Sequence, residues 1–269
     1  MAVWRSYANT TSFRYGLITR ASVVNNPTVN YLVCKKTTFL DKLTADQILG
    51  GKKMSVKYAD RFTSGWYQRL FAWLMAHATA KYEAEMSDRK REMFANLHGN
   101  ILEIGPGTGP NLRYYPNDVR WIGIEPNTHM YSYLQQEAER VGLDINIKNG
   151  TAEQLDAEDN SIDAVVSTLV LCSVENLSTV LREILRVLKP GGQFYFLEHV
   201  AAPQKTQLRR IQNWIQPIWT VLGDGCHPNR ETWLVLENAG FERVDYQHFR
   251  ADVPAIVSPQ IIGVAVKKA

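Results

Sequence analysis

The stretch Ile101-Leu-Glu-Ile-Gly-Pro-Gly-Thr-Gly-Pro110 decides the fold, because a short apolar run breaks there into three alternating glycines. The apolar run predicts a buried strand, and the glycines predict a turn at its end. Gly105, Gly107 and Gly109 lack a Cβ, so the backbone can turn sharply at these positions and approach a ligand closely. The stretch therefore predicts a strand that leads into a loop able to cradle a cofactor.

The spacing of the glycines separates two kinds of nucleotide cofactor. A dinucleotide-binding turn reads Gly-x-Gly-x-x-Gly, whereas this chain reads Glu-x-Gly-x-Gly-x-Gly from Glu103 onward. Glu103 would repel a phosphate but could receive a cationic ligand. A second apolar run, Trp121-Ile-Gly-Ile-Glu125, ends in a carboxylate, which at a strand end can accept both hydroxyls of a ribose. The pattern argues against a dehydrogenase.

Both features resemble motifs I and II of the class I S-adenosylmethionine-dependent methyltransferases. The resemblance implies that the loop wraps the amino-acid end of the cofactor and that Glu125 holds its ribose. The adenine contact stays open between Ala152 and Glu153. The residues expected to bind S-adenosylmethionine, or its product S-adenosylhomocysteine, are Glu103, Gly105, Gly107, Gly109, Glu125, Pro126, Met130, Ala152, Glu153, Thr168 and Leu169.

Strands and helices alternate through most of residues 101–200, which predicts a parallel, doubly wound sheet. The expected strands are 101–104, 119–124, 145–148, 161–168, 193–198, 242–249 and 261–267, and the expected helices are 111–115, 130–141, 178–188, 208–222 and 230–239. No helix separates the last two strands, so they should form an antiparallel edge. The fold class is thus α/β, with a mostly parallel, Rossmann-like sheet of seven strands and N-terminal lid helices, as the resemblance implies.

Composition bounds the domain organisation and the partners. A chain of 269 residues, 45% of them hydrophobic, can bury one large core and carry an appendage. Residues 1–53 hold eight Lys and Arg against two acidic residues, so the remainder carries a net −3 out of a total of +3. This mildly acidic body has no basic stripe, which argues against a nucleic-acid partner. The oligomeric state is not indicated.

The chain divides into three expected parts. Residues 1–53 are predicted to be a basic leader or a poorly ordered extension, although an ordered arm is an alternative. Residues 54–98 are predicted to form helices that cover the active site, and residues 99–269 the cofactor-binding domain. Apolar positions in the second part recur every three or four residues, as in an amphipathic helix. Its segment 70–76 could be a lid, a surface that touches lipid, or a helix packed on the sheet.

The cysteines and the apolar runs bear on metals and location. Cys34, Cys172 and Cys226 lie far apart and form neither a zinc spacing nor an even disulfide framework, so no metal is expected and a reducing compartment fits best. No run of 18 apolar residues occurs, so no transmembrane segment is expected. The expected location is cytoplasmic. An organelle is the alternative, because residues 1–40 contain basic but no acidic residues, as transit peptides do.

Two further stretches narrow the resemblance. The run Glu183-Ile-Leu-Arg-Val-Leu-Lys-Pro-Gly-Gly192 and the strand after it resemble the type 11 methyltransferase domain. The segments 168–174, 194–202, 224–226 and 230–232 are similar to the methyltransferase-like-seven group, which includes animal alkyl thiol S-methyltransferases. The resemblance covers residues 66–266. The animal proteins carry a hydrophobic membrane anchor at the N-terminus, and this chain has a polar basic segment there, so membrane attachment does not carry over.

Ligands of open parallel sheets bind beyond the carboxyl ends of the strands, which directs the search for catalytic groups. His199 is the candidate general base, since an imidazole can take a proton near neutral pH; it could instead be a structural histidine at a strand end. Asp224 would orient or deprotonate the acceptor, or form a structural ion pair with Arg230. Cys172, Trp73 and Arg230 are the candidate substrate contacts. A metal site from Asp224, Cys226 and His227 is disfavoured, because neighbouring loop positions rarely converge on one ion.

The expected activity is transfer of a methyl group from S-adenosylmethionine to a small-molecule acceptor, with a thiol as the leading candidate. A thiol is partly ionised near neutral pH and its thiolate is a strong nucleophile, so few catalytic side chains are required. The alternatives are O-, N- or C-methylation of a lipid-like or isoprenoid molecule, and a protein that binds the cofactor without catalysis.

Overall fold

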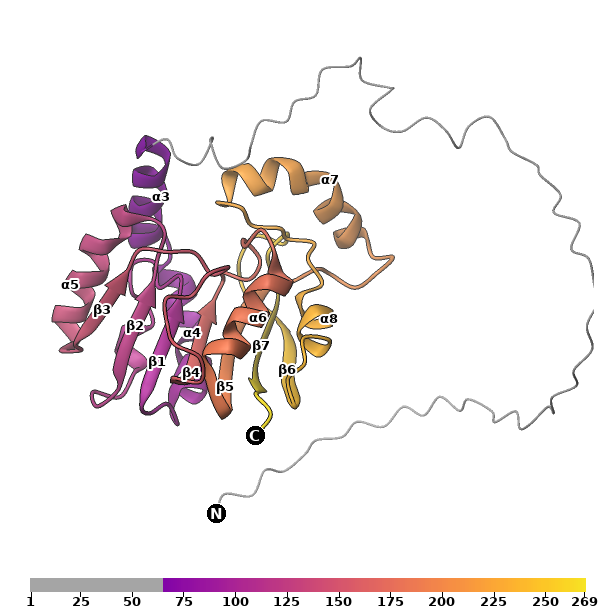
Figure 1. Ribbon diagram of the computed structural model, residues 1–269. Helices are drawn as coiled ribbons and strands as arrows, with labels where there is room; N and C mark the ends of the chain where they lie inside the picture. The colour runs from indigo at the N-terminus through magenta and orange to yellow at the C-terminus, as the bar shows by residue number, and fades with distance from the viewer. Residues whose placement is uncertain (1–64) are drawn as a thin grey trace, which may run out of the picture. The chain divides into compact units, whose positions relative to one another are not determined.

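A computed structural model describes residues 65–269 of the chain, which build one sheet flanked by helices (Figure 1). The predictions for residues 1–53, for Cys34 and for the compartment concern residues outside this range and stay predictions. The elements are α3 (Gly65–Ala78), α4 (Ala80–Phe94), β1 (Asn100–Ile104), η1 (Leu112–Tyr114), β2 (Arg120–Ile124), η2 (Thr128–Met130), α5 (Tyr131–Val141), β3 (Ile145–Lys148), β4 (Ile162–Thr168), α6 (Leu177–Val187), β5 (Leu188–His199), α7 (Gln207–Leu222), α8 (Thr232–Glu237), β6 (Arg243–Arg250) and β7 (Pro259–Val266).

The seven strands form a single sheet in the order β3-β2-β1-β4-β5-β7-β6. The first five strands run parallel, and β7 pairs antiparallel with both β5 and β6. This confirms the expected doubly wound sheet with an antiparallel C-terminal edge. The last strand of the chain lies inside the sheet, between β5 and β6.

Helices cover both faces of the sheet. Successive residues of a buried strand point to opposite faces, so each strand contributes apolar side chains to both cores. Ile101 belongs to the core under α4 and α5, with Phe94 and Leu134. The next residue, Leu102, belongs to the core under α6 and α8, which also holds Ile184. The strands therefore read as nearly continuous apolar runs.

Three elements differ from the expected ones. The segment 111–115 forms only the short 3₁₀ turn η1, because Pro110 and Pro116 leave too few residues for α-helical hydrogen bonds. Helix α8 starts two residues late, since the carbonyl of Arg230 accepts a hydrogen bond from the amide of Ala201 instead. The Pro-Gly-Gly turn is a bulge inside β5, where the register against β4 shifts and Gly191 has φ +73°.

Helices α3 and α7 lie beyond the carboxyl ends of the strands (Figure 1). The hydroxyl of Tyr67 on α3 donates to the carbonyl of Val221 on α7, and Asn127, just after β2, donates to the carbonyl of Gln68. Ala72 is the one fully buried residue of α3. Of the alternatives for residues 70–76, packing on a sheet face is therefore wrong; α4 takes that place, through Met86 and Phe94.

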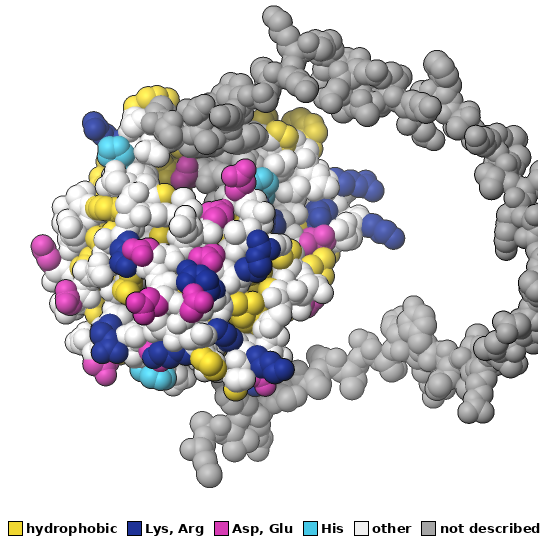
Figure 2. Space-filling model, viewed as in Figure 1, with side chains coloured by type: hydrophobic (Ala, Val, Ile, Leu, Met, Phe, Trp, Pro, Cys, Tyr) yellow, Lys and Arg dark blue, Asp and Glu magenta, His cyan; other side chains and the backbone are white. Residues whose placement is uncertain are grey.

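The face of the molecule in Figure 2 carries charges of both signs. Figure 2 shows Lys and Arg side chains intermixed with Asp and Glu on the face in view, and apolar side chains near its upper end. The exposed apolar residues of α3 and α7 include Trp66, Leu70, Trp214 and Ile218. Within residues 65–269, no helix has both the length and the apolar content needed to cross a bilayer.

Candidate active site at the carboxyl ends of the strands

Glu103 lies at the centre of a buried hydrogen-bond cluster beneath the glycine loop. Its two carboxylate oxygens accept from Asn111 Nδ2 at 2.7 Å, Tyr115 Oη at 2.9 Å and Trp121 Nε1 at 3.1 Å. Burial raises the pKa of Glu103, while these hydrogen bonds act in the opposite direction. The side chain thus holds neighbouring residues in place, and its predicted contact with a cationic ligand stays a prediction.

Asn111 connects this cluster to the end of β4. Its amide group donates to Glu103 and also to Thr168 Oγ1 at 2.9 Å. The Asn111 Oδ1 atom is buried and has no hydrogen-bond partner among the described residues. A buried acceptor without a donor costs about 1–3 kcal/mol, so this position suits a ligand that brings an N–H group. The sequence analysis did not predict a role for Asn111. Its position as a polar residue directly after the glycine loop was the feature that could have indicated one.

The glycine loop has the left-handed backbone expected of it. Gly105 has φ +60° and Gly107 has φ +57°. A Cβ at Gly105 would lie 2.6 Å from Val170 Cγ2, so this glycine permits close packing against the segment after β4. A Cβ at Gly107 would meet no atom of residues 65–269 within 4 Å. Among these residues, open space therefore lies next to Gly107, as a cradle for a ligand requires.

Glu125 ends β2 directly beside this open space. Its carboxylate accepts the backbone N–H groups of Gly107 at 3.0 Å and Asn127 at 2.9 Å. A carboxylate has about four lone-pair positions, so both oxygens can still accept a hydroxyl. Burial raises the pKa of Glu125 to about 7, with a smaller contribution from the negative charge of Asp224.

The remaining predicted cofactor residues follow β2, β3 and β4 at the same edge of the sheet. Pro126 is exposed, whereas Met130 and Ala152 are buried. The Glu153 carboxylate accepts the backbone N–H of Glu175 at 3.1 Å. Leu169 has φ +60°, a strained conformation for a residue with a side chain. The topology gathers these residues, while their individual roles stay predictions.

A loop after α7 closes the other half of this edge. The backbone N–H of His227 donates to the carbonyl of Cys172 at 2.8 Å, and Arg230 Nη1 donates to the carbonyls of Leu171 and Val174. The Arg230 guanidinium therefore ties the loop to the segment after β4. The structural ion pair with Asp224 that the sequence left open is not among the ion pairs of residues 65–269.

Asp224 begins this loop with φ +49°, and Gly225 follows with φ +87°. A Cβ at Gly225 would lie 2.9 Å from the carbonyl oxygen of Ser173, so only glycine fits this close approach. Burial raises the pKa of Asp224. Its charge acts on Tyr67 and on Glu125, which places Asp224 toward the glycine loop. No hydrogen bond or ion pair between described residues joins Asp224 to His199, its predicted catalytic partner.

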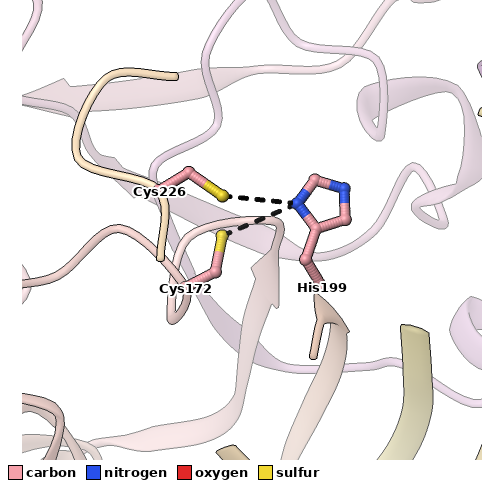
Figure 3. A group of neighbouring side chains, drawn as sticks. All are labelled: Cys172, His199 and Cys226. Atoms are coloured by element: carbon pink, nitrogen blue, oxygen red, sulfur yellow. Dashed lines mark hydrogen bonds between the residues drawn. The ribbon is translucent and has the colours of Figure 1, made fainter. Parts of the chain in front are cut away.

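His199 instead lies against two cysteines (Figure 3). Its Nδ1 atom is 3.9 Å from Cys172 Sγ and 3.7 Å from Cys226 Sγ. Cys172 follows β4, His199 ends β5, and Cys226 belongs to the loop after α7. The spacing of these residues along the chain did not predict the cluster. The expected pairing of β4 with β5 could have indicated that Cys172 and His199 lie close together.

Trp73 lies apart from these groups. It is 50% exposed, stacks on His77 with a ring separation of 4.9 Å, and lines a groove between α3 and residues 128–135. The groove contains His129 and Tyr133 but neither His199 nor the two cysteines. A substrate contact by Trp73 stays a prediction that this placement does not support.

Comparison with known proteins agrees with the fold. Residues 102–196 match the family model described as a methyltransferase domain. The chain is 38% identical over 212 residues to thiol S-methyltransferase TMT1A of Homo sapiens, covering 74% of this chain and 87% of that protein. A SAM-dependent methyltransferase from Aquifex aeolicus has 16% identity and a TM-score of 0.52, with 74% and 97% of the two chains covered.

A third comparison warns against inferring a reaction from the fold. The [4+2]-cyclase SpnF shares the fold with a TM-score of 0.55 and 21% identity, over 68% of this chain and 80% of that one. The matching family model and the 38% identity, together with the sheet order and the glycine loop, identify the chain as a methyltransferase of the Rossmann-like class. Within this class, the chain belongs to the family of the thiol S-methyltransferases represented by human TMT1A.

Proposed function

We propose that the protein transfers a methyl group from S-adenosylmethionine to the sulfur of a small-molecule thiol. The observation that carries the choice of acceptor is the 38% identity to a thiol S-methyltransferase, which spans 87% of that protein. The alignment covers 74% of this chain.

The residues around the glycine loop fit this cofactor. The unpartnered Asn111 Oδ1 could accept from its amino group, and Glu125 could accept its ribose hydroxyls. The open space at Gly107 would admit the part of the cofactor that lies against the backbone of the glycine loop. When bound, S-adenosylmethionine supplies an electrophilic methyl group carried by a sulfonium.

The second half of the edge would receive the acceptor. His199 is half-buried at the end of β5, where it could contact the acceptor thiol. The loop after α7 and helix α3 would exclude water and orient the acceptor, because Tyr67 and Arg230 attach them to neighbouring segments. Positioning alone can supply much of the rate in such a displacement.

The test combines binding with turnover in one sample. Calorimetry would measure the affinities of S-adenosylmethionine and S-adenosylhomocysteine, and a methylation assay would then use alkyl and aryl thiols beside phenols and amines of matched shape. We expect binding of both nucleosides and turnover of thiols. Binding followed by methylation of phenols, amines or isoprenoids alone would contradict the choice of acceptor.

Two other results would contradict more than the choice of acceptor. Binding without turnover of any acceptor would favour the non-catalytic alternative. Absence of binding by the intact chain would overturn the cofactor assignment. Asn111→Ala, which removes the unpartnered oxygen, should weaken binding at least about tenfold, since a hydrogen bond to a charged group contributes about 1.5–3 kcal/mol.

A further inference from the structure

The cluster of Cys172, His199 and Cys226 contains three groups that bind metals. Their ligand atoms lie within 4.8 Å of one another, and both sulfurs face the same nitrogen, His199 Nδ1 (Figure 3). Three separate segments contribute one group each, and both cysteines are buried and free of disulfides. Such convergence of lone pairs on one point is the arrangement that a cation requires.

The separations match a tetrahedral zinc site. Zinc lies about 2.3 Å from cysteine sulfur and about 2.0–2.1 Å from histidine nitrogen, so tetrahedral angles place sulfur and nitrogen about 3.6 Å apart. The observed sulfur–nitrogen distances are 3.7 and 3.9 Å. The cluster could therefore hold the ion with little rearrangement.

Hydrogen bonding without a metal can also satisfy this arrangement. A neutral imidazole has a single acceptor nitrogen, so Nδ1 cannot accept a full hydrogen bond from both thiols. Cys172 Sγ has another acceptor within reach, the carbonyl of Leu169 at 3.5 Å, which leaves Nδ1 to Cys226. The metal content of the purified protein therefore separates the two arrangements.

Two surrounding residues determine the charge balance of the cluster. The buried Glu198 carboxylate accepts the backbone N–H groups of Cys172 and Val170 and the Ser167 hydroxyl, which fixes the segment that carries Cys172. Arg230 also faces the cysteines. Two thiolates and Glu198 would offset the charges of Arg230 and of a divalent ion. Second-layer groups of this kind orient ligands in known metal sites.

We propose that Cys172, His199 and Cys226 bind a Zn²⁺ ion whose fourth position takes the sulfur of the acceptor thiol. Each cysteine releases its proton to solvent as its sulfur bonds to zinc. The acceptor releases its own proton on binding in the same way, so the ion, rather than the imidazole, keeps the acceptor ionised. Three protein ligands with one open position are typical of catalytic zinc. The binding of the acceptor sulfur by the zinc ion rests on the proposed function.

Metal binding is tested without any activity assay. The full chain is purified in a reducing, chelator-free buffer with a tag that binds no metal, and zinc is measured by mass spectrometry. We expect about one zinc per chain. Cobalt added to the metal-free protein should produce sulfur-to-cobalt charge-transfer bands and the intense visible bands of a tetrahedral site.

Variants assign the ligands. Cys172→Ser, Cys226→Ser and His199→Gln should each lower the zinc content at least tenfold. His227→Gln is the matched control, because its Nδ1 faces the Arg230 guanidinium at 3.3 Å and it is not part of the cluster. Circular dichroism and thermal unfolding identify a variant that fails to fold. In that case, cobalt spectra of the intact protein still decide the proposal, since thiolate ligation has its own absorption.

The proposed role of zinc in catalysis is tested separately, through kcat/KM. A thiol with an ordinary pKa near 8.5 is only about 3% ionised at pH 7. Removing zinc with a chelator should therefore lower kcat/KM up to about thirtyfold at pH 7 and much less above pH 9, and added zinc should restore it. A zinc-free protein with full turnover would overturn the proposal and leave the proposed function intact. Zinc bound without any thiol turnover would retain the metal site and overturn the catalytic half.

A disulfide is the remaining competitor for the two cysteines. Mass spectrometry of the alkylated protein would detect a Cys172–Cys226 bond. If this bond persists under reducing conditions, or if the reduced protein binds neither zinc nor cobalt at micromolar concentrations, the metal site does not exist.

Discussion

The hydroxyl of Tyr67 on α3 donates to the carbonyl oxygen of Val221 on α7 at 3.1 Å, although 154 positions separate the two residues. This contact connects the two helices that lie beyond the carboxyl ends of the strands. Tyr67→Phe removes the hydroxyl, at a net cost of about 1 kcal/mol. We expect KM for the acceptor to rise about fivefold with little change in kcat, measured by steady-state kinetics. Tyr246→Phe is the control, because that hydroxyl bonds Glu237 on the exposed side of α8; an equal effect there would refute the assignment.

Gly105→Ala should remove cofactor binding. The residue has φ +60°, and a Cβ would lie 2.6 Å from Val170 Cγ2 on a stiff, branched side chain. Gly142→Ala offers a matched control, since Gly142 has φ +72° but a Cβ there would meet no atom within 4 Å. Both variants carry the left-handed strain of about 1–2 kcal/mol, and only the first should weaken S-adenosylhomocysteine binding, by at least tenfold in calorimetry. Equal affinities would argue against a role of the loop.

Glu103→Gln should destabilise the domain. Three buried donors converge on this carboxylate, and the new amide presents its own N–H groups to at least one of them. A buried donor left unpaired costs about 1–3 kcal/mol, so the midpoint of denaturant unfolding should fall clearly with an unchanged slope. Exposed Glu175→Gln is the comparison. An unaltered midpoint would show that the cluster does not support the loop.

Glu125 makes stability and cofactor affinity depend on pH in opposite ways. Burial raises its pKa from 4.5 to about 7, so between these values the folded protein holds a proton that the unfolded chain lacks. The unfolding free energy contributed by this group is therefore highest at low pH and falls as pH rises to 7, by at most about 1.4 kcal/mol per unit. Ionised Glu125 is the better acceptor for ribose hydroxyls, so affinity should increase from pH 6 to pH 8.

The variant Glu125→Gln isolates this effect. The difference in unfolding free energy between the two proteins, followed by denaturant titration from pH 5 to pH 8, should carry the slope described above. The affinity of the variant for S-adenosylhomocysteine should be nearly independent of pH in that range. Parallel profiles of the two proteins would exclude Glu125 as the titrating group.

Local patterns were sufficient for the sheet and for the positions of Glu103 and Glu125 at its edge. Glu103 and Glu125 end their apolar runs, and parallel strands bring their carboxyl ends to one edge, so spacing along the chain predicts their position. Periodicity also predicted α3, but not its place, because aromatic residues such as Trp66 and Trp73 suit a core as well as an exposed lid.

The acceptor half depends on contacts that no local pattern contains. Cys226 reaches His199 only because the close approach at Gly225 and the two hydrogen bonds from Arg230 hold the loop against the end of β4. Among possible metal ligands, the sequence analysis considered only the neighbouring residues Asp224, Cys226 and His227, and it disfavoured them. Pairings between distant segments are decided by packing, which spacing does not record.

The inner position of β7 has a consequence for biosynthesis. Residues 259–266 are synthesised after the other six strands, yet their strand hydrogen-bonds β5 on one side and β6 on the other. Until this segment leaves the ribosome, β5 exposes an unpaired apolar edge of the kind that promotes aggregation. The nascent chain must therefore keep a nearly finished sheet open, and chaperones that shield strand edges should matter more for this protein than for one whose final strand lies at the rim.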